Sequence, residues 1–116
     1  MNSYEGFIHQ SRYARWREED GRRETWDETV DRYITAMANA MESKGVGVAS
    51  ELHPALASAS QMVKDFKVMP SMRALMSSGK ALDKDHVAGY NCSYLPLDSL
   101  YAFDEAMYIL MCGTGV

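Results

Sequence analysis

Cys92 is the residue with the clearest potential for chemistry in this chain of 116 residues. It lies in the run 87–95, which is short, rich in Tyr, Val and Leu, and bounded by Gly and Pro, so a β-strand is predicted there. Because side chains alternate along a strand, Tyr90, Cys92 and Tyr94 are expected to share one face. Such a thiol can carry redox chemistry. On these residues alone, a buried cysteine that packs as a small apolar side chain is the simpler interpretation.

The other metal-binding and redox residue types form no motif. The two cysteines are twenty positions apart and lack a CxxC pattern or a histidine at metal-binding spacing, which excludes a zinc site and a disulfide framework. His9, His53 and His86 each stand alone, and no chemistry is assigned to them.

A glycine turn closes the segment that follows Cys92. Asp98 or Ser99 is expected to cap a helix that is apolar on nearly every side and therefore buried on more than one face. This helix runs into Gly113-Thr114-Gly115, a turn that can bring backbone N–H groups close to a ligand.

Two longer helices are predicted to precede and position this region. The first opens with Thr25-Trp-Asp-Glu28, a capping box, and ends at Lys44-Gly45. The second follows Gly45-Val46-Gly47 and has Pro54 in its first turn. The residues expected to be packed on these helices are Trp26, Val30, Tyr33, Ile34, Met37 and Met41, and then Leu52, Leu56, Ala59, Met62, Val63 and Phe66.

Met69-Pro70 is expected to break the second helix, because proline lacks the N–H and pushes its predecessor toward extended geometry. Ser71 to Gly79 is then predicted as a short extended or single-turn element.

The charged residues argue against general binding of nucleic acid. Arginines and aromatic residues alternate in the first part of the chain, but acidic residues lie among them and the net charge is −4. These residues are Arg12, Arg15, Arg17, Arg22 and Arg23, with Tyr13 and Trp16, against Glu18, Glu19, Asp20 and Glu24. The sequence has no apolar run of about 18 residues and no leader pattern, so neither a membrane span nor a signal peptide is expected and the cytoplasm is the predicted location.

Three blocks in order resemble a known family. They are Val68-Met-Pro-Ser-Met-Arg-Ala-Leu-Met-Ser-Ser-Gly-Lys-Ala-Leu-Asp83, Val87-Ala-Gly-Tyr-Asn-Cys-Ser-Tyr-Leu-Pro96 and Ala102-Phe-Asp-Glu-Ala-Met-Tyr-Ile-Leu-Met-Cys-Gly-Thr-Gly-Val116. Together they resemble the amino-terminal part of a ribonucleotide reductase catalytic chain, most closely the adenosylcobalamin-dependent, monomeric ribonucleoside-triphosphate reductases. The resemblance covers roughly residues 10 to 116.

The resemblance implies a fold that is mainly α with the first β-strand or strands of a ten-stranded α/β barrel, as an incomplete domain. Residues 1–67 would be a helical lead-in and residues 68–116 the truncated start of the barrel. A second polypeptide carrying the rest of the barrel is then the expected partner, and the chain is not expected to be active alone.

The resemblance also implies site residues. Cys92 matches one of the two cysteines whose oxidation to a disulfide reduces the ribonucleotide, and a thioredoxin-like or dithiol reductant would restore them. Ser71, Asn91, Thr114 and Gly115 match positions near the substrate. Arg73 could bind a phosphate or pair with Asp83 or Asp85. Adenosylcobalamin would be bound mainly outside this chain, no metal site is expected, and Cys112 matches no redox position.

Two other interpretations remain open. The chain could be a helical regulatory module derived from a reductase, which would fold alone and tolerate replacement of Cys92. A self-contained thiol oxidoreductase is the weaker interpretation, because nothing near Cys92 in the sequence provides a resolving thiol.

Overall fold

The structure is a computed structural model that describes residues 1–45 and 52–116. Val46 and Gly47, expected to lead into the second long helix, lie outside the described residues. The elements are α1 (Ser3–Ile8), a π-helical turn η1 (His9–Tyr13), β1 (Trp16–Arg17), β2 (Arg22–Arg23), α2 (Trp26–Ser43), α3 (Leu52–Lys64), α4 (Met72–Ser77), α5 (Lys80–Lys84), a 3₁₀ turn η2 (His86–Gly89) and α6 (Tyr101–Met111). The fold is therefore mainly helical, as predicted.

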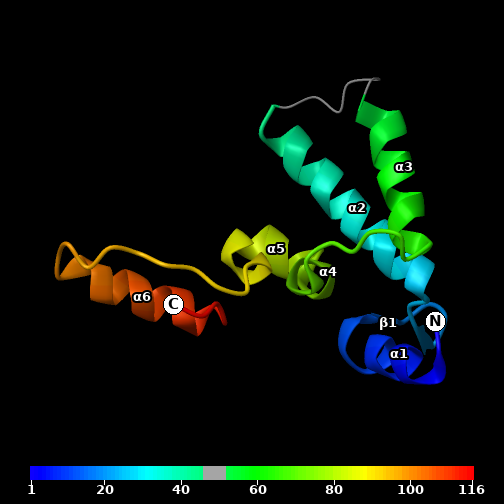
Figure 1. The fold of residues 1–116 in the computed structure, drawn as a ribbon, viewed down its shortest axis with the longest axis horizontal. Coiled ribbons are helices and arrows are strands. Elements are labelled where there is room, and N and C mark those ends of the chain that lie inside the picture. The colour runs from blue at the N-terminus through cyan, green and yellow to red at the C-terminus, as the bar shows by residue number, and fades with distance from the viewer. Residues whose placement is uncertain (46–51) are drawn as a thin grey trace.

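Helices α2 and α3 pack side by side as the longest elements (Figure 1). The predicted capping box of α2 is confirmed: the Thr25 hydroxyl accepts the Glu28 N–H at 3.3 Å, and the Glu28 carboxylate accepts the Thr25 N–H at 2.7 Å. These reciprocal bonds satisfy two donors that a helix start leaves free, which is why α2 begins where the sequence predicts. Its end at Lys44 is also as predicted.

Aromatic rings pack the start of α2 against the segment that ends α3. The Trp26 ring stacks on Phe66 with centroids 5.0 Å apart, and His9 meets it edge-on at 5.6 Å. The Trp26 Nε1–H donates to the Lys64 carbonyl at 3.3 Å. The apolar stripe predicted on α3 is buried only in part, since Val63 is 4% exposed whereas Met62 and Phe66 are 40% and 46% exposed.

A buried ion pair lies where α2, α4 and the N-terminal segment meet. Arg32 of α2 contacts Glu24 through Nε at 2.9 Å, and their side chains are 17% and 10% exposed. The remaining guanidinium N–H groups donate to the carbonyls of Leu75, Ser78 and Tyr13 at 2.8 to 3.1 Å. One side chain thus connects three segments that are far apart in the sequence.

Glu24 and His9 extend this buried network through Thr29. The Thr29 hydroxyl lies 3.1 Å from a Glu24 oxygen and 2.8 Å from His9 Nε2. Burial raises the pKa of Glu24, but hydrogen bonds from Arg32, the Arg15 N–H and Thr29 outweigh it and hold that pKa below its ordinary value. Burial lowers the pKa of His9, and Arg32 acts in the same direction while Glu24 opposes both.

Met72–Ser77 form the short helix α4, so of the two alternatives predicted for residues 71–79 the structure has a short helical element rather than an extended one. Ser71 is the N-cap of α4 and its side chain accepts the Ala74 N–H at 3.4 Å. A second short helix, α5, follows Gly79, whose φ of 99° permits the turn between them. Helices α4 and α5 lie between the α2–α3 pair and α6 (Figure 1).

The predicted strand over residues 87–95 is wrong. Residues His86–Gly89 form η2, and within the described residues the extended segment that follows makes one isolated parallel bridge, between Cys92 and Gly115. An extended backbone forms a strand only when neighbouring backbones take its N–H and C=O groups, and here a single residue does so. The sheet that does form is the antiparallel pair β1–β2, with Trp16 opposite Arg23 and Arg17 opposite Arg22.

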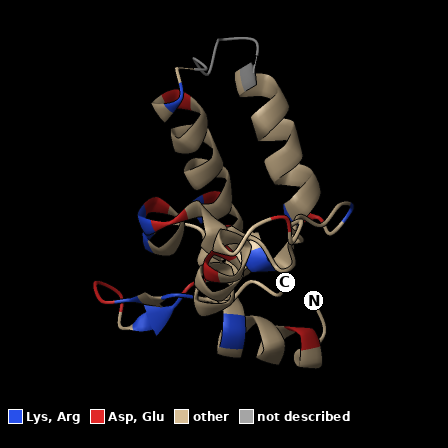
Figure 2. Ribbon diagram, turned by 90° about the vertical axis from the view of Figure 1, so that its left-hand side faces the viewer, with Lys and Arg blue, Asp and Glu red and all other residues tan. Residues whose placement is uncertain are grey.

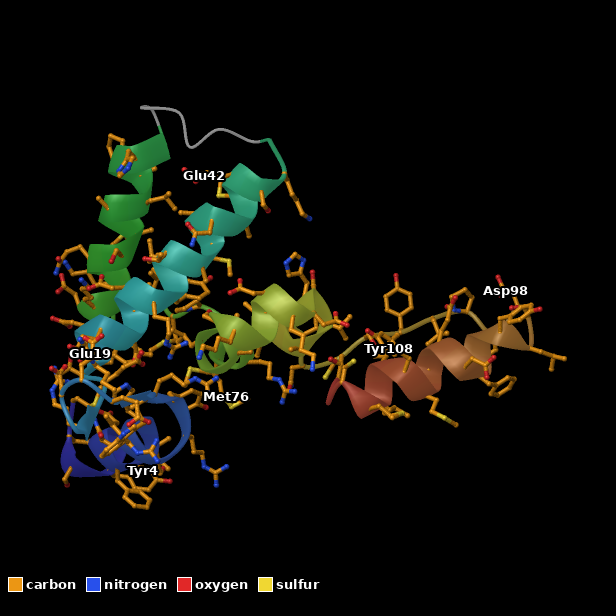
Figure 3. All side chains as sticks on the ribbon, turned by 180° about the vertical axis from the view of Figure 1, so that it is seen from behind. Tyr4, Glu19, Glu42, Met76, Asp98 and Tyr108 are labelled. Carbon is orange, nitrogen blue, oxygen red and sulfur yellow. The ribbon has the colours of Figure 1, made fainter. Side chains whose placement is uncertain are left out.

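Helix α6 is exposed, which corrects the expectation that it is buried on more than one face. Ala102 is its one fully buried residue, whereas Tyr101 and Met111 are 76% and 81% exposed. Side chains project from α6 into open space over most of its length (Figure 3). Its N-cap is Leu100, without a side-chain cap, rather than Asp98 or Ser99. Composition predicted burial, but the described segments place no second apolar surface against the helix.

Candidate functional site

A cavity of about 290 Å³ brings two predicted site residues together. Ser71 at the start of α4 and Asn91 after η2 line it, although they are far apart in the sequence. Its other lining residues are Tyr13, Met72, Arg73 and Met76. Tyr13, Met72 and Met76 were not predicted as lining residues. For Tyr13 no local pattern indicates that the N-terminal segment lies beside α4.

Cys92 follows Asn91 directly and is exposed. The Asn91 amide donates toward the Cys92 sulfur at 3.7 Å. The simpler interpretation of this residue as a buried apolar side chain is therefore wrong, and the thiol is open to another molecule. Tyr90 and Tyr94, predicted on the same face, are likewise exposed at 65% and 94%.

The predicted turn residues Thr114 and Gly115 lie beside Cys92. The contact with the neighbours of Cys92 is made by the backbone of Gly115 and not by a side chain of the turn. Gly115 donates its N–H to the Asn91 carbonyl at 3.0 Å, and its carbonyl accepts the Ser93 N–H at 2.7 Å. Thr114 is buried, and its hydroxyl lies 2.9 Å from the carbonyls of both Val87 and Tyr90. The Thr114 side chain thus holds the turn in place. Substrate contact by Thr114 and Gly115 stays a prediction.

Arg73 makes neither of the ion pairs considered from the sequence. Its Nε–H donates to the Ala88 carbonyl at 3.0 Å and an Nη2–H donates to the Gly113 carbonyl at 3.2 Å. Among the described residues no carboxylate, Asp83 and Asp85 included, lies within ion-pair distance of it. The guanidinium therefore joins α4 to both segments that carry the other predicted site residues.

Asp85 is instead the partner of Tyr108 on α6. The Tyr108 hydroxyl donates to the Asp85 carboxylate. This bond, with a smaller contribution from Cys112, raises the pKa of Tyr108 to about 12. The same bond and the Val87 N–H lower the pKa of Asp85. In the sequence Tyr108 is one more apolar residue of the predicted helix, and no local signal predicts its contact with Asp85.

Two of the arginines near the N-terminus are neutralised by ion pairs. Arg17 and Arg22 both pair with Glu28, at 2.8 Å in each case, and both contact Asp20. Figure 2 shows acidic and basic segments close together along the β1–β2 hairpin. In the described part of the chain, no group of three or more His, Cys, Asp or Glu residues could hold a metal ion. In that same part, no helix is both long and apolar enough to cross a membrane.

Comparison with known proteins identifies a family for this chain. The family model described as the ribonucleotide reductase alpha domain matches residues 1–82. This is more than half of the sequence, and the chain belongs to the ribonucleotide reductase alpha-domain family. The match includes Ser71 and Arg73, while Asn91, Cys92 and the glycine turn lie beyond it. No curated protein and no solved structure matches the chain.

Proposed function

We propose that this chain forms the amino-terminal part of a ribonucleotide reductase, in which Cys92 is one of two redox thiols and the cavity beside it receives part of the ribonucleotide. The observation that carries the proposal is the exposed Cys92 thiol directly after Asn91, a residue that lines a cavity together with Ser71 and Arg73. The family match supports the reaction class.

The reaction needs a second thiol. Replacement of the ribose 2′-hydroxyl by hydrogen consumes two electrons and two protons and releases water, and two thiols supply these as they join in a disulfide. We do not assign this role to Cys112, because it matches no redox position in the family that the chain resembles. In the structure Cys112 ends α6 and directly precedes the turn whose Gly115 lies beside Cys92. We assign the second thiol to the remainder of the enzyme, and a thioredoxin-like or small dithiol reductant to the reduction of the disulfide. The cytoplasm, where thiols are kept reduced, is the proposed location.

Adenosylcobalamin is the proposed source of the radical that activates the substrate. The described residues do not fit a site for it: His9 is buried against Thr29, and the metal-binding side chains form no cluster. We propose that other parts of the complete enzyme bind it.

Helix α6 is the proposed contact with a second polypeptide that carries the rest of the barrel. Large apolar side chains on it are more than half exposed, and exposed apolar patches of this kind mark interaction surfaces. They are Leu100, Tyr101, Phe103, Met107, Tyr108, Leu110 and Met111. On this proposal the chain alone binds no complete substrate and is inactive.

The test is reconstitution. The 116-residue chain is mixed with a second polypeptide, which carries the part of a family member's barrel that follows the region equivalent to this chain. Deoxyribonucleotide formation is then measured in the presence of adenosylcobalamin and a dithiol. Turnover by the mixture, none by either part, and none with Cys92→Ser is expected. Full turnover with Cys92→Ser would show that Cys92 is not a redox thiol of this reaction.

A regulatory module is the second candidate, favoured by an apolar cavity of about 590 Å³ between α2 and α4–η2. Met37 and Met41, expected to be packed, are half-buried and line this cavity instead. A module would bind an intact reductase and would keep its effect on turnover in the Cys92→Ser variant. A sharp cooperative thermal transition of the isolated chain would also favour it.

A further inference from the structure

Arg73 reaches from α4 to two segments that are separate in the sequence. One hydrogen bond goes to Ala88 at the end of η2, and the other goes to Gly113 after α6. Helix α4 is itself anchored, because Leu75 is fully buried and its carbonyl accepts a hydrogen bond from Arg32. Arg73 therefore connects the buried polar network to the segment that carries Cys92.

The turn after α6 is shaped around the Arg73 guanidinium. Gly113 has a φ of 87°, and a Cβ at this position would lie 2.5 Å from Arg73 Nη2. Glycine is therefore favoured here, because any other residue would strain the backbone at this φ and displace the guanidinium. The next two residues continue the contact, since Thr114 is buried and Gly115 bonds to the backbone on both sides of Cys92.

These contacts form a direct chain from Arg73 to the thiol. The guanidinium donates to the Gly113 carbonyl. Two residues later, the Gly115 N–H donates to the Asn91 carbonyl at 3.0 Å and the Gly115 carbonyl accepts the Ser93 N–H at 2.7 Å. Cys92 lies between those two positions. A shift of the turn would therefore move the Cys92 backbone relative to the cavity that Ser71 and Asn91 line.

We propose that Arg73 is a positioning residue, which fixes the Gly113–Gly115 turn and through it sets where the Cys92 thiol lies beside the cavity. This inference rests on the proposed redox role of Cys92. A direct role as a phosphate ligand fits the contacts less well. The Nε and Nη2 edge, which would give a phosphate two parallel hydrogen bonds, is directed at two backbone carbonyls.

The first test measures amide hydrogen exchange in the 116-residue chain for Arg73→Met, Arg73→Lys and the control Arg12→Met, whose arginine is exposed. We expect exchange at Ser93 and Gly115 to become about tenfold faster in Arg73→Met, because the turn is no longer held. Arg73→Lys should restore part of the protection and Arg12→Met should match the parent. Unchanged exchange in Arg73→Met would overturn the proposal.

Gly113→Ala is a second variant that tests the same contact without changing Arg73, because the added Cβ displaces the guanidinium from the turn. It therefore separates loss of this contact from a general loss of fold. The amide of Val30, which is fully buried in α2, reports the rest of the fold. Faster exchange at Ser93 and Gly115 with Val30 unchanged supports the proposal. Equal loss of protection at all three sites in both variants would mean that Arg73 is merely structural, and would overturn it.

The second test uses the reconstituted enzyme. Positioning predicts that Arg73→Met lowers kcat with little change in KM and that Arg73→Lys recovers part of kcat. A raised KM with kcat unchanged would identify a phosphate ligand and overturn the proposal. Retained turnover in Cys92→Ser would overturn the proposed function and, with it, the functional part of this inference. Unchanged exchange alongside an inactive Cys92→Ser would overturn the role of Arg73 alone.

Discussion

At the scale of single residues, Arg32 is the side chain on which the described fold depends most. Its guanidinium pairs with a buried carboxylate and also donates hydrogen bonds to three backbone carbonyls in two other segments. Removing one partner of such a pair leaves the other charge buried without compensation, which is more costly than never having formed the pair.

We therefore predict that Arg32→Met lowers the free energy of unfolding by about 3–5 kcal/mol, measured by urea denaturation. Arg32→Lys should lose less, because it keeps the charge but cannot reach all three carbonyls. Arg22→Met is the matched control, since Arg22 pairs with Glu28 at the surface and should matter far less. Equal losses for Arg32→Met and Arg22→Met would contradict the assignment.

His9 gives the same network a pH dependence. Its pKa is lowered in the fold from 6.5, so the unfolded chain binds the proton more readily. The stabilisation by neutral His9 is therefore present above pH 6.5 and is lost as the pH falls below it, toward the folded pKa. Glu24, whose pKa is lowered from 4.5, acts with the same sign in a more acidic range.

We predict that the free energy of unfolding falls between pH 7 and about pH 5, and that His9→Gln flattens this fall. Glutamine does not titrate and can still donate to Thr29. His53→Gln, which changes an exposed histidine, should leave the slope as it is. A slope that persists in His9→Gln would place its origin elsewhere.

At the scale of elements, α6 differs from the other long helices in what covers it. Helix α2 packs against α3 and α4, whereas α6 lies alongside the extended segment before it (Figure 1) and has no comparable packing against another described helix. Its apolar side chains therefore contribute little to the stability of this chain by itself. They remain available to stabilise an assembly.

We predict that Met111→Glu, at a position 81% exposed, changes the free energy of unfolding by less than about 0.5 kcal/mol but weakens binding to the completing polypeptide at least tenfold. Glu105→Gln, also exposed on α6, is the control and should preserve binding. The binding is measured by titration calorimetry with the reconstituting partner. Unchanged affinity in Met111→Glu would remove α6 from the interface.

At the scale of the whole molecule, the chain has two parts of different packing. Residues 1–45 and 52–84 surround the buried network, while residues 90–116 form an arm. Contacts of Arg73, Thr114 and Tyr108 hold this arm to the rest, and the Cys92–Gly115 bridge joins its two ends. The molecule is accordingly elongated, with extents of 47 × 37 × 29 Å.

We predict that the two parts open separately. Native-state hydrogen exchange should show the slowest amides around Val30 and Leu75, which are fully buried, and much faster amides along α6. The completing polypeptide should slow the α6 amides and leave those of Val30 and Leu75 nearly unchanged. Uniform protection across the isolated chain would contradict this division.

The sequence by itself determined the features whose hydrogen bonds close within a few residues. The capping box at Thr25 and Glu28 gave the start of α2 correctly. The family resemblance pointed to Ser71 and Asn91, which line one cavity, and their contact with substrate stays a prediction. The tertiary structure alone decided the rest. A strand at Cys92 needs a neighbouring backbone, a buried α6 needs an apolar surface against it, and Arg32 and Arg73 bind carbonyls about 40 residues away. Those partners are set by how distant segments pack, and no local pattern specifies them.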